Sequence, residues 1–554
     1  MAKRYAVLPK ESGAMWTRDR VRLDADIYRP NAAGPFPVLL MRQPYGRAIA
    51  STVVYAHPTW YAAQGFIVVI QDVRGRGTSE GEFHLFEHEV DDGFDTVAWA
   101  ATLPQSNGQV GMYGFSYQGM TQLFAAAALP PALKAIAPAM VGYHPREDWA
   151  YEHGAFLLQA GVGWAIQLAA ETARLRGDDD AFHHLYQAAR QLPIHDETPA
   201  CPGVLQQYAP DSFLHDWLRH PPDSDYWQGI TPQLDQVDLP MLHIGGWFDP
   251  YLRGDLRLHR ELAARSQYPQ PLWIGPWGHI PWGRQVGERD FGPAANSPID
   301  RLQVEWFAHW LQDDAPPSWQ PTPLHLFEMG ANCWRSRPAW GQQTQRCQLA
   351  SHGLAAMDQE DGKLIFQPTI PAADRPAPPE LPSIDTWVHD PWRPVPSLGG
   401  HAAMPAGAFN RAVIDSRSDV LTYTSVPLQA ELAVAGQIEV ALHCQCDRPT
   451  FDLSITLSEV LPDGTVYPLT QGYGRFEVPA QQWSTCRLTL QPTCFALPVG
   501  QALRLSISAA CFPAYVVNPG TGEADKDSRL IKAKITTISL QASHGATQIL
   551  LPLS

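Results

Sequence analysis

The sequence predicts an α/β fold that is interrupted by a helical insertion and followed by an all-β region. Over residues 21–140, short β-branched runs alternate with loops and helical stretches, as in a largely parallel sheet with crossover helices. Beyond about residue 330, apolar and polar residues alternate with a period of two, which is typical of half-buried strands. A chain of 554 residues is also long enough for two or three domains.

The predicted strands of the α/β region are short and apolar. They cover residues 21–28, 36–41, 66–71, 110–113 and 135–138, and similar runs return at 240–245 and 271–274. We therefore expect one sheet in two parts, residues 1–142 and 238–330, with an insertion between them.

The insertion, residues 143–237, has helical periodicity. Its segments WAIQLAAETARLR and DDAFHHLYQAARQL place apolar residues at the spacing of one helix face, which predicts a helical cap. After Pro298, an amphipathic helix is expected to present Leu302, Trp306, Phe307, Trp310 and Leu311 on one stripe. The proline-rich stretch APPSWQPTP then ends that helix.

The last region, residues 331–554, is predicted to be a jelly-roll β-sandwich of the galactose-binding-like kind. The runs FDLSITLSEV, CRLTLQ and LRLSIS alternate apolar and polar residues, and Asp463-Gly464 suits a hairpin turn. Residues 367–410 are rich in Pro, Gly and Ala, and we expect them to wrap over the surface as an extended arm.

Charge and composition exclude several classes of partner. The net charge of -16 disfavours nucleic acid and anionic membrane surfaces, which select for clustered Lys and Arg. No apolar run approaches the roughly 20 residues of a membrane span, and the amino terminus lacks the apolar core of a secretory signal, so we expect a cytoplasmic protein. The eight cysteines show no CxxC spacing, and we predict neither a metal nor a cofactor.

A serine between two glycines is the strongest chemical signal in the chain. The sequence VGMYGFSYQGMTQLFAAAAL places Gly114-Phe115-Ser116-Tyr117-Gln118-Gly119 after a predicted strand and before a predicted helix. G-x-S-x-G in that context is the nucleophile elbow of α/β-hydrolases. The serine hydroxyl is a weak nucleophile, so it needs a histidine to accept its proton and a carboxylate to orient that histidine.

One carboxylate and one histidine stand where this topology requires them. In α/β-hydrolases the acid and then the histidine follow the serine, each at the carboxyl end of a later strand. Asp249 closes the run PMLHIGGWFDP, and His279 closes PLWIGPWGH. We therefore predict a triad of Ser116, Asp249 and His279.

Five motifs in order carry a resemblance that extends over nearly the whole chain. They are RQPYG (42–46), QDVRGRGTSEGEF (71–83), GFSYQG (114–119), GGWFD (245–249) and GPWGH (275–279). With the β-rich region that follows, the chain resembles the cocaine esterase-like (CocE/NonD) hydrolases of the X-Pro dipeptidyl-peptidase (S15) family. The resemblance implies an α/β-hydrolase domain, a helical cap and a jelly roll that meet at the active site.

The resemblance also implies roles for further residues. Ser116 matches the nucleophile, His279 the base and Asp249 the orienting acid, while the Tyr45 hydroxyl and the Tyr117 backbone N–H match the two donors to the oxyanion. Aromatic residues match an apolar acyl pocket that suits a neutral or aromatic acyl group; they are Trp149, Trp164, Trp247 and Tyr251.

The RGRGTSEG loop contains Arg74, Arg76 and Glu80, but it matches neither G-x-G-x-x-G nor a P-loop. We expect an ion-pair network that stabilises this long loop.

Three functions remain to be distinguished. The first is a serine esterase or amidase acting on a small-molecule ester or amide. The second is another activity on the same scaffold: an X-Pro dipeptidyl-peptidase, an α-amino acid ester hydrolase or a β-lactam acylase. For the amino acid ester hydrolase, Glu147, Asp148 and Glu152 could supply the charge that holds a substrate ammonium. The third is a non-enzymatic carbohydrate-binding protein that uses the jelly roll. The sequence does not determine the oligomeric state, and a homodimer is compatible with it.

Overall fold

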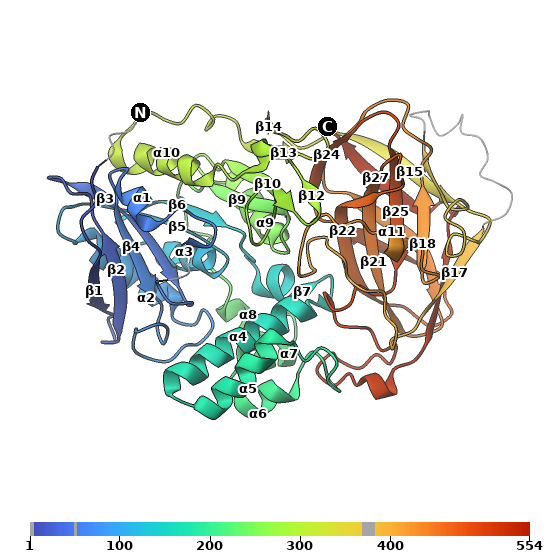
Figure 1. Ribbon diagram of the computed structural model, residues 1–554, viewed down its shortest axis with the longest axis horizontal. Coiled ribbons are helices and arrows are strands. Elements are labelled where there is room, and N and C mark those ends of the chain that lie inside the picture. The colour runs from blue at the N-terminus through green and yellow to red at the C-terminus, as the bar shows by residue number, and fades with distance from the viewer. Residues whose placement is uncertain (1–4, 49–51, 368–382) are drawn as a thin grey trace.

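The computed structural model describes residues 5–48, 52–367 and 383–554. Figure 1 shows three parts of the molecule: an α/β part, a group of helices below the centre of the view, and a large β part formed by the carboxyl-terminal residues. The first sheet has ten strands in the order β1-β2-β4-β3-β5-β6-β9-β10-β13-β14. In chain order they are β1 (Glu11–Trp16), β2 (Arg22–Tyr28), β3 (Phe36–Gln43), β4 (Ile67–Asp72), β5 (Ser106–Phe115), β6 (Leu133–Ala139), β9 (His243–Phe248), β10 (Leu272–Gly278), β13 (Leu324–Glu328) and β14 (Cys333–Arg337).

The strands from β4 to β13 in this order run parallel, with antiparallel strands at both edges. Their side chains alternate between two apolar layers, since successive residues of a strand point to opposite faces. Val38 and Leu40 pack into one layer, whereas Leu39 and Met41 pack into the other. The sheet is thus buried on both faces, which explains the apolar runs in its sequence.

Helices cover each face of this sheet. Apolar residues of α1 (Pro58–Ala62) and α10 (Ile299–Gln312) pack on the Leu39 side. Those of α2 (Glu89–Ala101), α3 (Tyr117–Ala127) and α9 (Leu252–Ala263) pack on the Val38 side. The predicted amphipathic stripe of α10 is largely buried, with Trp306 fully enclosed.

The helical insertion joins the Val38 side of the core. It starts with a short π-helix (Pro145–Ala150) and the two-residue strands β7 (Tyr151–Glu152) and β8 (Ala155–Phe156). Five helices follow: α4 (Leu158–Arg176), α5 (Asp179–Arg190), α6 (Gly203–Tyr208), α7 (Phe213–Arg219) and α8 (Asp225–Gly229). Leu158, Leu185 and Trp217 belong to the same apolar cluster as α2 and α3, so the insertion is packed firmly on the sheet domain.

In the described residues of the carboxyl-terminal part, thirteen strands form a second sheet. These are β15 (Gln343–Ala350), β16 (Lys363–Phe366), β17 (Ile384–His389), β18 (Val420–Thr424), β19 (Leu432–Gly436), β20 (Glu439–Cys446), β21 (Thr450–Val460), β22 (Val466–Glu477), β23 (Ser484–Thr489), β24 (Thr493–Leu497), β25 (Ala502–Ser508), β26 (Thr536–Gln541) and β27 (Gln548–Leu553). Gly464 has a φ of 86° in the turn between β21 and β22, the left-handed region that Gly enters readily.

Several strands are absent from the sequence prediction, among them the buried β13 as well as β1, β14 and β17. The edge strands β1 and β14 expose much of their surface, so they lack the apolar run that marks the buried strands. Residues 384–389, predicted to lie in an extended arm, form β17 and pair with β26, because Asp385, Trp387 and His389 turn inward. Residues 368–382 of that arm lie outside the described residues.

A buried polar cluster joins the insertion, the α/β part and the second sheet. Glu152 accepts hydrogen bonds from Arg253 (2.6 Å), His401 Nε2 (2.9 Å) and the Tyr515 hydroxyl (2.6 Å). All but Arg253 are almost fully buried. Because Glu152 belongs to the insertion, Arg253 to the α/β part, and both His401 and Tyr515 to the carboxyl-terminal part, this cluster joins the three parts.

In the part of the chain that the structure describes, no helix is long and apolar enough to cross a membrane.

Candidate active site

Ser116 stands at the junction of β5 and α3 in a strained backbone conformation. Its φ of 59° is unusual for any residue other than Gly. A Cβ on Gly119 would lie 2.4 Å from Val141 Cγ1, and one on Gly114 would lie 2.5 Å from Gln118 Cβ. The two glycines of the motif are therefore required by close packing around the turn, which holds the serine side chain at the carboxyl end of β5.

The Tyr45 hydroxyl lies beside Ser116. It interacts with the Ser116 side chain and accepts a hydrogen bond of 3.1 Å from Trp164 Nε1 on α4. Burial raises the pKa of Tyr45 to about 12, so its hydroxyl keeps its proton at neutral pH. Because Trp164 occupies an acceptor position, the phenolic proton is free to point toward the serine.

Tyr117 begins helix α3 directly after Ser116. The backbone N–H groups of a first helical turn have no acceptor within the helix, so the Tyr117 amide is available at this position. The Tyr117 side chain points away into the core, where its hydroxyl donates to Glu89 (2.8 Å), which in turn pairs with Arg42. This buried chain anchors the start of α3.

Asp249 and His279 form a pair at the ends of β9 and β10. His279 Nδ1 lies 2.8 Å from Asp249 Oδ1; the aspartate is completely buried, whereas the histidine side chain is 27% exposed. The buried carboxylate thus fixes the imidazole in one orientation with its other nitrogen directed outward. The pairing and the strand positions are those that the sequence predicts.

Ser116, Asp249 and His279 all lie at the carboxyl ends of strands of the first sheet. They follow β5, β9 and β10, which are parallel and nearly adjacent in the order β5-β6-β9-β10. The Phe115 and His279 rings are 5.3 Å apart between centroids, which brings the histidine next to the elbow. Within the described residues, Ser116 itself makes no hydrogen bond to His279.

The second sheet holds the Asp249 loop through one side chain. Gln491, which follows β23, donates from Nε2 to the carbonyl oxygens of Trp247 (2.9 Å) and Asp249 (3.0 Å). Only 2% of its surface is exposed. Sequence reasoning missed Gln491, since nothing local to it distinguishes it from any other polar residue of a β-rich region.

Three of the four aromatic residues predicted for a pocket lie in one row. Trp149 stacks on Trp164 (5.1 Å between ring centroids) and contacts Tyr251 (4.7 Å), and Tyr251 lies 5.0 Å from His279. Trp247 is not part of the row. Its indole donates to the Phe327 carbonyl (2.7 Å) and its ring belongs to the apolar cluster of the second sheet.

The acidic residues of the insertion are engaged in other contacts. Asp148 pairs with Arg257 (2.9 Å) and Glu152 with Arg253 (2.6 Å). Glu147 lies 3.6 Å from Arg146. Each carboxylate that could hold a substrate ammonium thus already has an arginine beside it.

The RGRGTSEG loop contains an ion-pair network, but Arg76 is outside it. Arg74 pairs with Asp19 and Asp92 (both 2.7 Å), and Glu80 lies 3.7 Å from Arg22. Among the described residues Arg76 has no carboxylate within ion-pair distance and instead contacts Leu168 and Phe83, so the predicted network was wrong for this residue.

Comparison with known proteins agrees with this architecture. The family model of the X-Pro dipeptidyl-peptidase (S15 family) matches residues 19–281, and that of the X-Pro dipeptidyl-peptidase C-terminal non-catalytic domain matches residues 317–546. A curated relative, the cocaine esterase of Rhodococcus sp. (strain MB1 Bresler), is 29% identical over 535 residues and 91% of each chain.

Solved structures share the fold over the whole chain. An aminopeptidase from a marine sediment Thaumarchaeota archaeon superposes with a TM-score of 0.82 at 21% identity, covering 99% of this chain and 96% of its own. An α-amino acid ester hydrolase superposes with a TM-score of 0.77 at 22% identity, covering 99% and 97%.

The fold is that of an α/β-hydrolase with an inserted helical cap and a carboxyl-terminal jelly roll. The chain belongs to the X-Pro dipeptidyl-peptidase (S15) family, as a cocaine esterase-like member, and is a serine hydrolase.

Proposed function

We propose that the chain hydrolyses small carboxylic esters through an acyl-enzyme, with Ser116 as nucleophile, His279 as base and Asp249 as the acid that orients the base. The proposal rests on one observation: the buried Asp249–His279 pair lies at the same end of the parallel strands as the strained turn that carries Ser116. A buried carboxylate paired with a partly exposed histidine beside a serine provides the groups that nucleophilic activation requires.

The reaction would proceed in two displacements. Ser116 Oγ attacks the ester carbonyl while its proton passes to His279 Nε2, and His279 then gives that proton to the departing alkoxide. Water next attacks the acyl-serine, its proton again passing to His279 and from there to Ser116. A Ser116–His279 hydrogen bond is expected to form in the substrate complex, since catalytic hydrogen bonds often tighten only there.

Two donors would stabilise the oxyanion that forms on the ester carbonyl. The Tyr45 hydroxyl lies next to Ser116, and the Tyr117 N–H is available at the start of α3. Both act mainly when negative charge develops, so they lower the free energy of the transition state more than that of the bound ester. The high pKa of Tyr45 suits a group that must donate without losing its proton.

The acyl group would lie against Trp149, Trp164 and Tyr251. This row is aromatic and ends at His279, so it favours a neutral acyl group and aromatic acyl groups in particular. Amine recognition, which an aminopeptidase or an amino acid ester hydrolase requires, would need an unpaired carboxylate here. Asp148 and Glu152 are paired with arginines, which disfavours that alternative.

Gln491 would act as a positioning residue for Asp249. It contacts the backbone on both sides of Phe248, at Trp247 and Asp249, and so fixes the loop that carries the acid. In this way the jelly roll would contribute to catalysis without touching the substrate.

A substrate panel tests the proposal. The purified protein and its Ser116→Ala variant are assayed with p-nitrophenyl acetate and p-nitrophenyl benzoate, with an X-Pro p-nitroanilide and with an amino acid methyl ester. We expect hydrolysis of the first two by the wild type alone. Preference for the amine-bearing substrates would favour the alternative, and equal rates for both proteins would refute Ser116 as nucleophile.

A further inference from the structure

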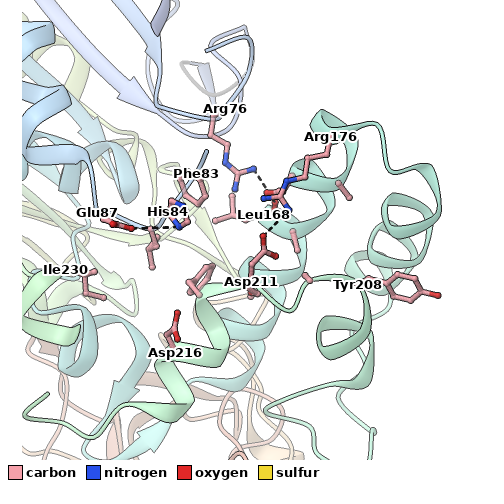
Figure 2. A pocket seen from close by; sticks show the side chains of 18 of the residues that line it. Arg76, Phe83, His84, Glu87, Leu168, Arg176, Tyr208, Asp211, Asp216 and Ile230 are labelled. Carbon is pink, nitrogen blue, oxygen red and sulfur yellow. Dashed lines mark hydrogen bonds and ion pairs between the residues drawn. The ribbon is translucent and has the colours of Figure 1, made fainter. Parts of the chain in front are cut away.

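A cavity of about 350 Å³ lies between the RGRGTSEG loop and the helices of the insertion (Figure 2). Its lining includes Arg76, Phe83 and Leu85, together with Leu168 on α4 and Ile230 after α8. Ser116, Tyr45, Asp249 and His279 are not among its lining residues, so it is separate from the proposed active site. Its volume lies within the range of small-molecule sites.

Arg76 carries an uncompensated charge in the wall of this cavity. Only 1% of its surface is exposed, and its guanidinium donates to the Leu168 carbonyl (3.2 Å) and lies over the Phe83 ring (3.9 Å to the centroid). Its Nε is buried without a partner. Burial lowers the pKa of Arg76 to about 10, so the group still carries its charge at neutral pH.

Several other charged groups of the wall have partners of their own, and the wall also contains Asp225 and Glu87, the latter 3.8 Å from His84. Arg176 pairs with Asp211 (2.9 Å), as Figure 2 shows, and Asp216 pairs with Arg219 (3.2 Å). Asp178 accepts from the Ala181 N–H (3.0 Å) and caps α5. These pairs leave the Arg76 guanidinium as the charged donor that a ligand in the cavity could satisfy.

Burying an unpaired cation is costly, and a ligand that supplies the opposite charge would offset that cost. Arginine is also the side chain whose planar donors match a carboxylate. The rest of the wall near it is largely apolar, with Leu85, Ala165, Leu168 and Phe213 among its residues. We propose that this cavity binds a small organic carboxylate with an apolar body, whose carboxylate pairs with Arg76.

The side chain of Trp164 connects the cavity wall to the Tyr45 hydroxyl, the proposed oxyanion donor. Phe213 in its wall packs on Trp164 (4.9 Å between centroids), and Trp164 donates to the Tyr45 hydroxyl. A carboxylate bound here would therefore lie beside the active site without occupying it.

Calorimetric titration with phenylacetate tests the proposal, with the neutral 2-phenylethanol as matched ligand. We expect phenylacetate to bind and 2-phenylethanol to bind at least about tenfold more weakly, since it cannot pair with the guanidinium. Arg76→Met should weaken phenylacetate binding at least about tenfold, and Arg76→Lys should retain part of it because it keeps the charge.

Arg74→Met is the matched control, because Arg74 belongs to the same loop but pairs with Asp19 and Asp92 and does not line the cavity. It should lower the Tm and leave phenylacetate affinity unchanged, whereas Arg76→Met should leave the Tm of the ligand-free protein unchanged or raise it.

Unchanged phenylacetate binding by Arg76→Met would overturn the proposal, as would equal affinity for the neutral ligand or the absence of phenylacetate binding to the wild type. If Arg76→Met fails to fold, Arg76→Lys decides, and a folded Arg76→Lys protein without phenylacetate binding would also overturn it.

Discussion

The two halves of the proposed active site are held in different ways. Ser116 and Tyr117 are placed by a turn of six residues, and the glycines of that turn meet close contacts from Gln118 and Val141. Asp249 is placed by a loop whose carbonyl oxygens are bound by Gln491, 242 residues further along the chain. The nucleophile is thus fixed locally, whereas the acid depends on the carboxyl-terminal sheet.

From this difference we can predict which substitutions far from the active site affect catalysis. A substitution in the second sheet should change kcat only by displacing the Asp249 loop or by altering the packing between the three parts. A change at the elbow acts on the nucleophile directly. The following variants separate the two cases.

Removing any triad member should have the largest effect. We expect Ser116→Ala, Asp249→Asn and His279→Ala each to lower kcat roughly 10³-fold or more, with little further loss in combinations, because the three residues act as a unit. The measurement is kcat on p-nitrophenyl esters for the single and double variants. An Asp249→Asn variant with nearly full activity would show that another carboxylate orients His279.

Tyr45→Phe should have the next largest effect. It keeps the ring and deletes one hydroxyl, so kcat should fall roughly 10² to 10³-fold while KM and the Tm change little. Steady-state kinetics and thermal unfolding measure these quantities. A wild-type kcat would remove Tyr45 from the mechanism and leave the oxyanion to backbone N–H groups. A lower kcat accompanied by a Tm several degrees lower would be ambiguous, because a displaced RQPYG loop could then also explain the lost rate.

Gln491→Leu tests whether the carboxyl-terminal sheet holds Asp249 in position. Loss of its two hydrogen bonds should loosen Asp249 and lower kcat about tenfold with KM nearly unchanged, since small displacements of catalytic groups are costly. The matched control is Gln471→Leu, a buried glutamine of the same sheet whose side chain contacts Cys511 and not the Asp249 loop. If both variants lose stability but neither loses kcat, Gln491 has only a structural role.

Glu152→Gln tests the junction of the three parts and should affect stability more than the reaction. Burial alone would raise the pKa of Glu152, but the charges of Arg253 and His401 lower it well below its usual 4.5. The carboxylate therefore contributes its full stability above about pH 4.5 and loses it as the pH falls toward the lowered pKa. Breaking this cluster should cost about 3 kcal/mol at pH 7.

Denaturant unfolding between pH 3 and pH 8 measures this effect. The wild type should lose stability below about pH 4.5, while Glu152→Gln should be less stable at pH 7 and show a shallower decline toward acid. Parallel curves for the two proteins would show that Glu152 does not carry the acid sensitivity.

The sequence predicts the local half of the site better than the distant half. The elbow at Ser116, and Asp249 and His279 at strand ends, follow from strand patterns and from a motif whose glycines have a steric role. Gln491 and the Glu152 cluster depend on contacts between residues more than 100 positions apart, which periodicity does not reveal. Trp247 shows the same limit: its residue type suits a pocket, but its indole binds the Phe327 carbonyl, a contact between residues 80 positions apart.

The strands follow the same rule. Those buried on both faces, such as β3 and β4, carry apolar runs that the sequence displays, whereas the edge strands β1 and β14 do not. Arg76 was expected in an ion pair because of its charged neighbours, and only the fold shows that it turns toward Leu168 instead.

Covalent labelling with a fluorophosphonate tests the central claim most directly, because only an activated serine reacts quickly. Intact mass and peptide mapping should find one adduct, on Ser116, in the wild type. The labelling rate should fall at least about 10³-fold in His279→Ala and Asp249→Asn. An adduct on another residue, or a Ser116 that reacts at the same rate without His279, would contradict the account.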